Sequence, residues 1–223
     1  MRFRNDTDVA IQRRTTNGWL LLSLCALAGM LAVYGATYDQ AAWEVEAIQG
    51  VQGGPAPGTW IAEFMTAAGK SPWYMITASV AVGAFLVARR PWLAMVVGGA
   101  VVLRSISPVV KSIIDRERPD AGVVDVAYSL SDPSFPSGHV LGATLLYGAI
   151  IYAVELAVPV YWLKRAIQAV LLAGIVLMGY ARMELGAHWP TDVLAGWIIG
   201  FLLLSLLVWM HRRFDHRAHS ASN

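Results

Sequence analysis

Charged residues are scarce in this sequence. Only 14% of its 223 residues are Asp, Glu, Lys or Arg, whereas an ordinary soluble domain carries about 25%. Hydrophobic residues reach 57%, and the mean hydropathy is +0.52. A soluble globule of this length needs a far more polar surface, so the composition excludes that class of protein.

Cysteine is almost absent as well. The single cysteine, Cys25, has no second thiol in the chain with which to form a disulfide. A thiolate metal site would also need several cysteines, so both kinds of site are excluded. The sequence has no repeat with a period of 20–50 residues and no low-complexity tract, which favours one membrane domain.

Long runs without charge are what the sequence does contain, and about 18 apolar residues are typical of a membrane-spanning helix. Four runs lack charge, a fifth is interrupted once, by Arg104, and a sixth is short but uncharged. In chain order these runs are 15–38, 71–88, 91–110 (the interrupted one), 133–154, 166–181 (the short one) and 193–211. We therefore expect an all-α integral membrane bundle of six transmembrane helices.

The first run, 15–38, could also be a signal peptide. It is longer than a signal-peptide core, and no clear cleavage site of small residues follows it, so we expect it to be retained. The expected organisation is a cytoplasmic N-terminal segment at 1–18, a membrane domain at 19–211 and a cytoplasmic tail at 212–223.

The few charges are segregated along the chain. With the amino terminus in the cytoplasm, the inner segments hold eleven basic and four acidic residues, a balance of +7, and the remainder holds six basic and eleven acidic residues. Cytoplasmic loops carry an excess of Lys and Arg. We therefore expect a multi-pass protein of the cytoplasmic membrane with both termini inside. The outward segments are then 39–70, with a short interfacial helix at 59–68, 111–136 and 182–192.

Polar residues with chemical potential gather in the last two outward segments. Three groups occur in order: Lys111 with Arg118-Pro119, then Pro136-Ser137-Gly138-His139, then Arg182 with His188 and Asp192. Of five histidines, His139 and His188 are the two outside the carboxyl-terminal region, and both lie at helix ends on the same expected side of the membrane.

These groups are suited to binding a phosphate. Lys111, Arg118 and Arg182 supply positive charge, and arginine forks match phosphate oxygens. Ser137 opens a helix whose free N–H groups attract anions, and Gly138 allows a ligand to approach that backbone closely. Such a cradle needs no metal ion, and no cluster of carboxylates is spaced for magnesium.

The two histidines suit phosphoryl transfer. His188 and Asp192 are spaced i, i+4, so on a helical turn the carboxylate can orient one imidazole nitrogen and leave the other free to attack phosphorus. His139, on another helix, can act as the acid that protonates the leaving oxygen. Asp192 could instead be an N-cap of the last helix, or could serve both purposes.

With its three groups in this order, the sequence resembles the type 2 phosphatidic acid phosphatase superfamily. The resemblance implies a histidine nucleophile at His188, oriented by Asp192, and an acid at His139. It also implies that phosphate is bound by five residues, Lys111, Arg118, Ser137, Gly138 and Arg182. The family usually has Ser before the arginine of its third motif, where this chain has Ala181, so one hydroxyl contact is absent.

Other charges have more ordinary explanations. Arg104 lies on nearly the same helix face as Lys111, so it could extend the phosphate site, but pairing with a buried acid or a carbonyl is the commoner role of an intramembrane charge. The charged turn of Asp115, Arg116, Glu117 and Asp120 is expected to be a solvated loop.

The expected function is hydrolysis of a lipid phosphate or diphosphate, whose head group enters the cradle while its chains stay in the bilayer. The family implies undecaprenyl diphosphate, phosphatidic acid and phosphatidylglycerophosphate as candidate substrates. A lipid phosphotransferase is the main alternative, and a non-catalytic lipid-binding protein is a minor one. We expect no cofactor, no nucleic acid and no obligatory protein partner.

The charge segregation generates a prediction about sidedness. In a Cys25→Ser background, single cysteines at Asp125 and Arg165 should differ in labelling by a membrane-impermeant thiol reagent on intact cells. Only the Asp125→Cys protein should be labelled, because the positive segment around Arg165 is expected inside. Labelling of the Arg165→Cys protein alone would mean that the orientation is inverted.

Overall fold

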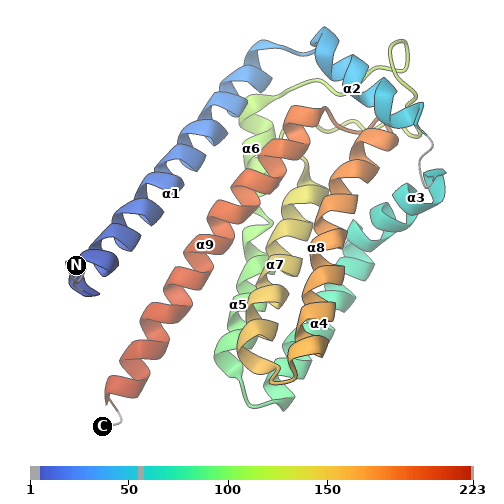
Figure 1. Ribbon diagram of the computed structural model, residues 1–223. Coiled ribbons are helices and arrows are strands. Elements are labelled where there is room, and N and C mark those ends of the chain that lie inside the picture. The colour runs from blue at the N-terminus through green and yellow to red at the C-terminus, as the bar shows by residue number, and fades with distance from the viewer. Residues whose placement is uncertain (1–5, 55–57, 222–223) are drawn as a thin grey trace.

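Helices make up nearly all of the regular structure (Figure 1). The computed structural model describes residues 6–54 and 58–221, and within these ranges the chain forms nine α-helices and no strands. The helices are α1 (Asp6–Thr37), α2 (Ala42–Gln52), α3 (Gly58–Gly69), α4 (Ser71–Val87), α5 (Pro91–Leu103), α6 (Ile106–Ile114), α7 (Gly138–Ala157), α8 (Tyr161–Glu184) and α9 (Pro190–Ala221).

The predicted all-α membrane bundle is confirmed. Five segments are long and apolar enough to cross a membrane, namely Gly18–Thr37, Pro91–Ile114, Gly138–Ala157, Tyr161–Glu184 and Pro190–Phe214. The sixth predicted span is α4, an apolar helix of 17 residues. Helices α1 and α9 run without a break through the predicted boundaries near residues 18 and 211, and the domain limits stay predictions.

One helix limit differs from the sequence-based expectation. The run 91–110 is not one helix, because the chain turns at Arg104 and Ser105 between α5 and α6. The uncharged run 133–154 becomes helical at Gly138 with Ser137 as the N-cap, which confirms the helix start expected at Ser137. Pro133 and Pro136 explain why the helix does not begin earlier, since proline removes a backbone donor and disfavours helical conformation in the residue before it.

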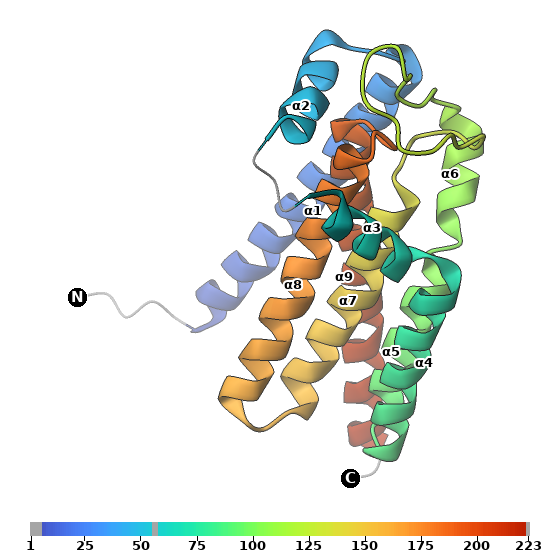
Figure 2. The same cartoon turned by 90° about the vertical axis from the view of Figure 1, so that its right-hand side faces the viewer.

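The bundle has two distinct ends (Figures 1 and 2). Helix α2 and the long connection from α6 to α7 lie at one end, where α9 also begins. The short connections from α4 to α5 and from α7 to α8 lie at the opposite end, toward which α9 runs. Helix α2 and the last two segments expected outside therefore share one end, whereas α3 lies farther along the bundle beside α8. The membrane side that this end faces stays a prediction.

Helix α7 is the centre of the bundle. It packs against α5, α8 and α9, and 67% of its apolar span is buried inside the protein, compared with 6% for the span of α1. Glycines in α9 allow that helix to come close. A Cβ added at Gly196 would lie 3.0 Å from Val140 Cβ and 3.1 Å from the Ser137 carbonyl oxygen. This packing holds the start of α7, and with it Ser137 to His139, against α9.

Of the two helices in the first outward segment, only α3 was predicted. Helix α3 confirms the short helix expected at 59–68. Helix α2 was not predicted, because its residues were assigned to a loop-rich outward segment. It buries Glu44 and Ile48, and Glu44 proves to be part of the site described below.

The contact at Gly196 generates a stability prediction. Gly196→Ala should lower the free energy of unfolding by about 1–3 kcal/mol, because the new methyl group overlaps the Cβ and backbone of α7, which cannot rotate away. Gly98→Ala is the matched control, since a Cβ there meets nothing within 4 Å and alanine favours helix. Thermal unfolding in detergent measures both variants, and equal midpoints would contradict this account of the packing.

Candidate active site

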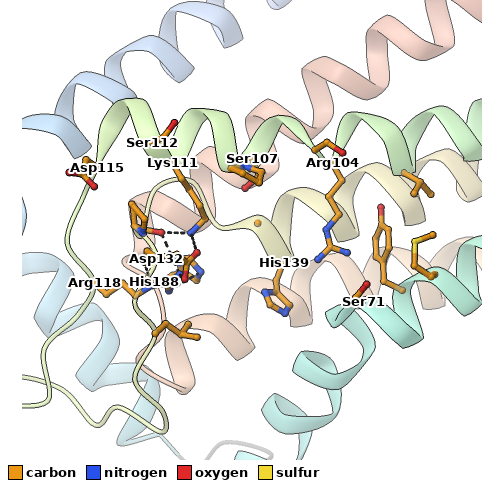
Figure 3. Close-up of a pocket in the computed structure, with 18 residues that line it drawn as sticks. Ser71, Arg104, Ser107, Lys111, Ser112, Asp115, Arg118, Asp132, His139 and His188 are labelled. Carbon is orange, nitrogen blue, oxygen red and sulfur yellow. Dashed lines mark hydrogen bonds and ion pairs between the residues drawn. The ribbon is translucent and has the colours of Figure 1, made fainter.

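One pocket of about 900 Å³ contains most of the predicted site (Figure 3). Its walls come from α4, from α5 and α6 on both sides of the break at Arg104, and from the start of α7. Five of the eight predicted site residues line it: Lys111, Arg118, Gly138, His139 and His188. The other three, Ser137, Arg182 and Asp192, are buried behind these residues.

Lys111 and Arg118 are paired with a carboxylate that was not predicted. Lys111 Nζ lies 2.8 Å from one oxygen of Asp132, and Arg118 Nη2 lies 3.0 Å from the other. Lys111 also donates to the Pro133 carbonyl, and Arg118 donates to the carbonyls of Asp132 and Ala187, at 2.7 and 2.5 Å. Asp132 is 55% exposed, so an incoming anion could compete with it for both cations.

His188 is fixed on one side and faces the pocket on the other. It lies in the turn before α9 and is 2% exposed. Its Nδ1 lies 3.6 Å from Asp192 Oδ2 and 3.3 Å from Ser134 Oγ, and the Ser134 hydroxyl donates to the same Asp192 oxygen. Ser134 thus bridges the pair, and His188 Nε2 is left 3.3 Å from Arg118 Nη1.

Asp192 faces His188 and also contributes to the first turn of α9, although it is not the N-cap that its sequence position suggested. It lies at the third residue of α9, not at the N-cap, and its Oδ2 accepts the Trp189 backbone N–H at 2.9 Å. A side chain that reaches back from this position satisfies a free amide at the helix start. Asp192 therefore stabilises the first turn of α9 while it faces His188.

A buried ion-pair network lies behind Asp192. The Arg116 guanidinium is 2.8 Å from Asp192 Oδ1 and 2.6 Å from Glu44 Oε2, and all three side chains are fully buried. Arg116 also donates to the Thr191 hydroxyl, which itself donates to Glu44. The expectation that Arg116 belongs to a solvated turn is wrong, because its side chain is fully buried. A buried charge needs buried partners, which Glu44 and Asp192 supply.

The start of α7 leaves polar atoms without partners. The Ser137 side chain makes no capping bond, although Ser137 is the N-cap residue. Its Oγ and the Nε2 of His139 are both buried without a hydrogen-bond partner. A buried polar atom left unpaired costs about 1–3 kcal/mol, so these atoms are suited to a ligand that supplies oxygen acceptors.

Arg182 has the same property. It lies in the last turn of α8, 1% exposed, and donates through Nη1 to the Tyr128 hydroxyl at 2.9 Å. Its Nε and Nη2 have no partner. The Arg182 carbonyl accepts the backbone N–H of His188 at 3.3 Å, so the two residues are neighbours in the fold.

Burial and charge determine the protonation of the site. Burial lowers the pKa of His188 from its usual 6.5 to about 4, and the positive charge of Arg118 contributes in the same direction, while Asp192 opposes it. Burial by itself would raise the pKa of Asp132, but Lys111 and Arg118 outweigh it and lower that pKa. At neutral pH the imidazole of His188 is therefore neutral, with an unprotonated nitrogen available.

Four residues that contribute to the site were not predicted from the sequence. Arg116, Asp132 and Ser134 contact predicted residues from positions that no motif marks, and Glu44 pairs with Arg116. Among the side chains that the structure describes, those of residues 18–54 and 59–214, no group of three or more His, Cys, Asp or Glu is arranged to hold a metal ion.

Comparison with known proteins gives a family match. A family model described as the PAP2 superfamily matches residues 91–215. Phosphatidylglycerophosphatase B of Bacillus subtilis is 37% identical over 106 residues, which are 47% of this chain and 50% of that protein. Undecaprenyl-diphosphatase of Sulfolobus acidocaldarius is 36% identical over 45% of each chain. The matched region thus spans about half the length of these curated relatives.

Solved structures show the same fold over more of the chain. A transmembrane PAP2 type phosphatidylglycerolphosphate phosphatase from Bacillus subtilis superposes with a TM-score of 0.73 at 26% identity, over 88% of this chain and 96% of that one. Aquifex aeolicus LpxE superposes with a TM-score of 0.54 at 22% identity, over 76% and 97% of the two chains, and shows likeness of fold alone.

The lowered pKa of His188 generates a prediction. In protein labelled with ¹⁵N-histidine, the signal that disappears in a His188→Gln variant should remain that of a neutral imidazole at pH 5.5. Its titration midpoint should lie near 4, because protonation would bury a charge beside Arg118. A midpoint near 6.5 would contradict the buried position described for this side chain.

Proposed function

The chain belongs to the PAP2 superfamily, and from this premise we propose that it is a membrane lipid phosphatase that works through a phosphohistidine at His188. The candidate substrates are undecaprenyl diphosphate, phosphatidic acid and phosphatidylglycerophosphate. Two relatives, a phosphatidylglycerophosphatase and an undecaprenyl-diphosphatase, support lipid phosphates and diphosphates as the substrate class.

One observation carries the proposal. A neutral histidine nitrogen borders the pocket, and buried donors without partners lie around it. These are the Ser137 hydroxyl, two nitrogens of Arg182 and His139 Nε2. A phosphoryl group supplies acceptor oxygens for such donors, and Lys111 and Arg118 neutralise its charge. A site built to bind only a lipid chain would have no use for so many donors.

The reaction follows from these positions in two steps. Nε2 of His188 attacks phosphorus, the bond from phosphorus to the lipid oxygen breaks, and His139 donates a proton to that oxygen. Water then attacks the phosphohistidine, gives its proton to His139 and releases inorganic phosphate. Asp192 and Ser134 hold Nδ1 throughout, which keeps Nε2 directed at the pocket.

The cradle supplies the charge stabilisation that a metal ion supplies in many phosphatases. Lys111, Arg118 and Arg182, with the free amides at the start of α7, face the negative charge of the transferred group. We expect no cofactor, and activity should persist in excess EDTA.

The proposal also includes the membrane side that the site faces. The pocket is bordered by α4 and α6, so a lipid head group can reach it while the acyl or prenyl chain stays in the bilayer. We place the protein in the cytoplasmic membrane with both termini inside and the site at the outer face, because the inner segments carry the excess of Lys and Arg.

The direct test is release of inorganic phosphate by purified protein in detergent with EDTA, using the three candidate lipids. The wild type should release phosphate from at least one lipid. Transfer of the phosphate to a second lipid without free phosphate would instead identify a phosphotransferase, and no turnover of any lipid would contradict the proposal.

The two histidines should fail in different ways. His188→Ala should abolish turnover of every substrate, because the phosphoryl acceptor is lost. His139→Ala should slow lipid hydrolysis by about 10²–10⁴-fold, the usual contribution of a general acid. The same variant should recover in part with p-nitrophenyl phosphate, whose leaving group needs no proton.

The matched control is His211→Ala. His211 lies at the far end of α9, where it contacts Tyr152, so this variant should keep wild-type rates. If His139→Ala were active with lipids and His188→Ala were rescued by p-nitrophenyl phosphate, the two roles would be exchanged.

A further inference from the structure

Arg104 is a positive charge inside a membrane span. It lies at the break between α5 and α6, within the span Pro91–Ile114, and among the described residues no carboxylate lies within ion-pair distance of it. Its Nη2 donates to the Gly69 carbonyl at 3.0 Å, and its guanidinium lies over the Tyr74 ring, 4.1 Å from the centroid. A charge in this position is costly unless it has a function or a bound counter-charge.

Arg104 faces the same pocket as the two histidines. It lines the pocket together with Tyr74, His139 and His188. Figure 3 shows His139 between the cluster of Lys111, Arg118 and His188 and the side chain of Arg104. The pocket therefore has two positive regions, one on each side of His139.

Two glycines bring Arg104 beside His139. Gly69, whose carbonyl accepts the Arg104 bond, lies directly against the His139 ring. A Cβ at Gly142, one turn after His139 in α7, would lie 3.1 Å from both Cδ and Nε of Arg104. Residues three apart share one face of a helix, so Arg104 packs on the face that carries His139.

Tyr74 provides an independent sign of a missing ligand. Its side chain lines the pocket and is 3% exposed, and its hydroxyl is buried without a hydrogen-bond partner. A tyrosine hydroxyl buried in this way usually finds a partner. The hydroxyl and the Arg104 guanidinium are thus two donors at the same end of the pocket.

The direction of the reaction indicates which part of the substrate would lie at this end of the pocket. In-line transfer places the nucleophile on one side of phosphorus and the leaving oxygen on the other. If His188 attacks and His139 protonates the leaving oxygen, the leaving group extends past His139 toward Arg104. This step rests on the function proposed above.

We propose that Arg104 and Tyr74 form a second anion subsite, which binds a phosphate carried by the leaving group of the substrate. Two of the candidate lipids have such a leaving group. A prenyl diphosphate leaves as a prenyl phosphate, and phosphatidylglycerophosphate leaves with its phosphodiester. Phosphatidic acid leaves as uncharged diacylglycerol and gives Arg104 no anion to bind, so the subsite favours lipids with two phosphates.

The test is the kcat/KM of Arg104→Gln with all three lipids. The variant should lose about 10- to 100-fold with undecaprenyl diphosphate or phosphatidylglycerophosphate, the size of one hydrogen bond to a charged group. Hydrolysis of phosphatidic acid should be nearly unchanged, which also shows that the variant is folded. The lipid with the larger loss identifies whether the bound group is the inner phosphate of a diphosphate or a phosphodiester.

Two further variants sharpen the comparison. Tyr74→Phe keeps the ring under the guanidinium and removes only the hydroxyl, so it should show a smaller selective loss, about 2- to 10-fold. Arg90→Gln removes an exposed arginine before α5, outside the pocket, and should leave the ratios between the lipids unchanged.

The outcomes separate this proposal from the proposed function. An equal loss of kcat/KM with all three lipids would mean that Arg104 only stabilises the backbone at Gly69, and would overturn the subsite. No loss with any lipid would overturn it as well. If the wild type hydrolyses none of them, the proposed function fails. The dissociation constants of the same lipids then test the subsite by itself. If the subsite exists, Arg104→Gln should weaken the binding of the lipids with two phosphates and not that of phosphatidic acid.

Discussion

The contact on which the site depends most is the buried pairing of Arg116 with Glu44 and Asp192. Three fully buried charges are stable only together, because removing one partner of such a network typically costs about 3–5 kcal/mol. The network ties α2, which lies at one end of the bundle, to the first turn of α9. It fixes Asp192, and Asp192 with Ser134 fixes His188. The orientation of a single imidazole thus rests on helices far apart in the chain.

Around that imidazole the protein keeps donors in excess of acceptors. Ser137, His139 and Arg182 each leave buried atoms without a hydrogen-bond partner among the described residues, while Asp132 pairs with Lys111 and Arg118 in the pocket. Buried donors without partners are unfavourable in the free protein, and under the proposed function a phosphate would supply the missing acceptors. Arg104 and the Tyr74 hydroxyl are the corresponding donors of the proposed second subsite, on the leaving-group side of the pocket.

Much of this could be predicted from the sequence, because hydrophobic length identifies membrane helices and because the catalytic residue types stand at helix ends in fixed order. The predicted residues do gather around one pocket. Glu44, Arg116, Asp132 and Ser134 could not be predicted, since their roles arise from contacts between segments up to 147 residues apart. The start of the fourth span was predicted at Ser137, and Ser137 is the N-cap of α7. Arg116 was expected in a solvated turn, because its burial depends on pairing with Glu44. Glu44 lies in α2, a helix that was not predicted.

The central claim is that His188 carries the phosphoryl group, and the most direct measurement is a rapid quench with a ³²P-labelled lipid substrate. The account predicts an alkali-stable, acid-labile label on the wild-type protein, located on the peptide that contains His188, and no label on His188→Ala protein. A label that persists in His188→Ala protein, or one located on another residue of the wild type, would contradict it.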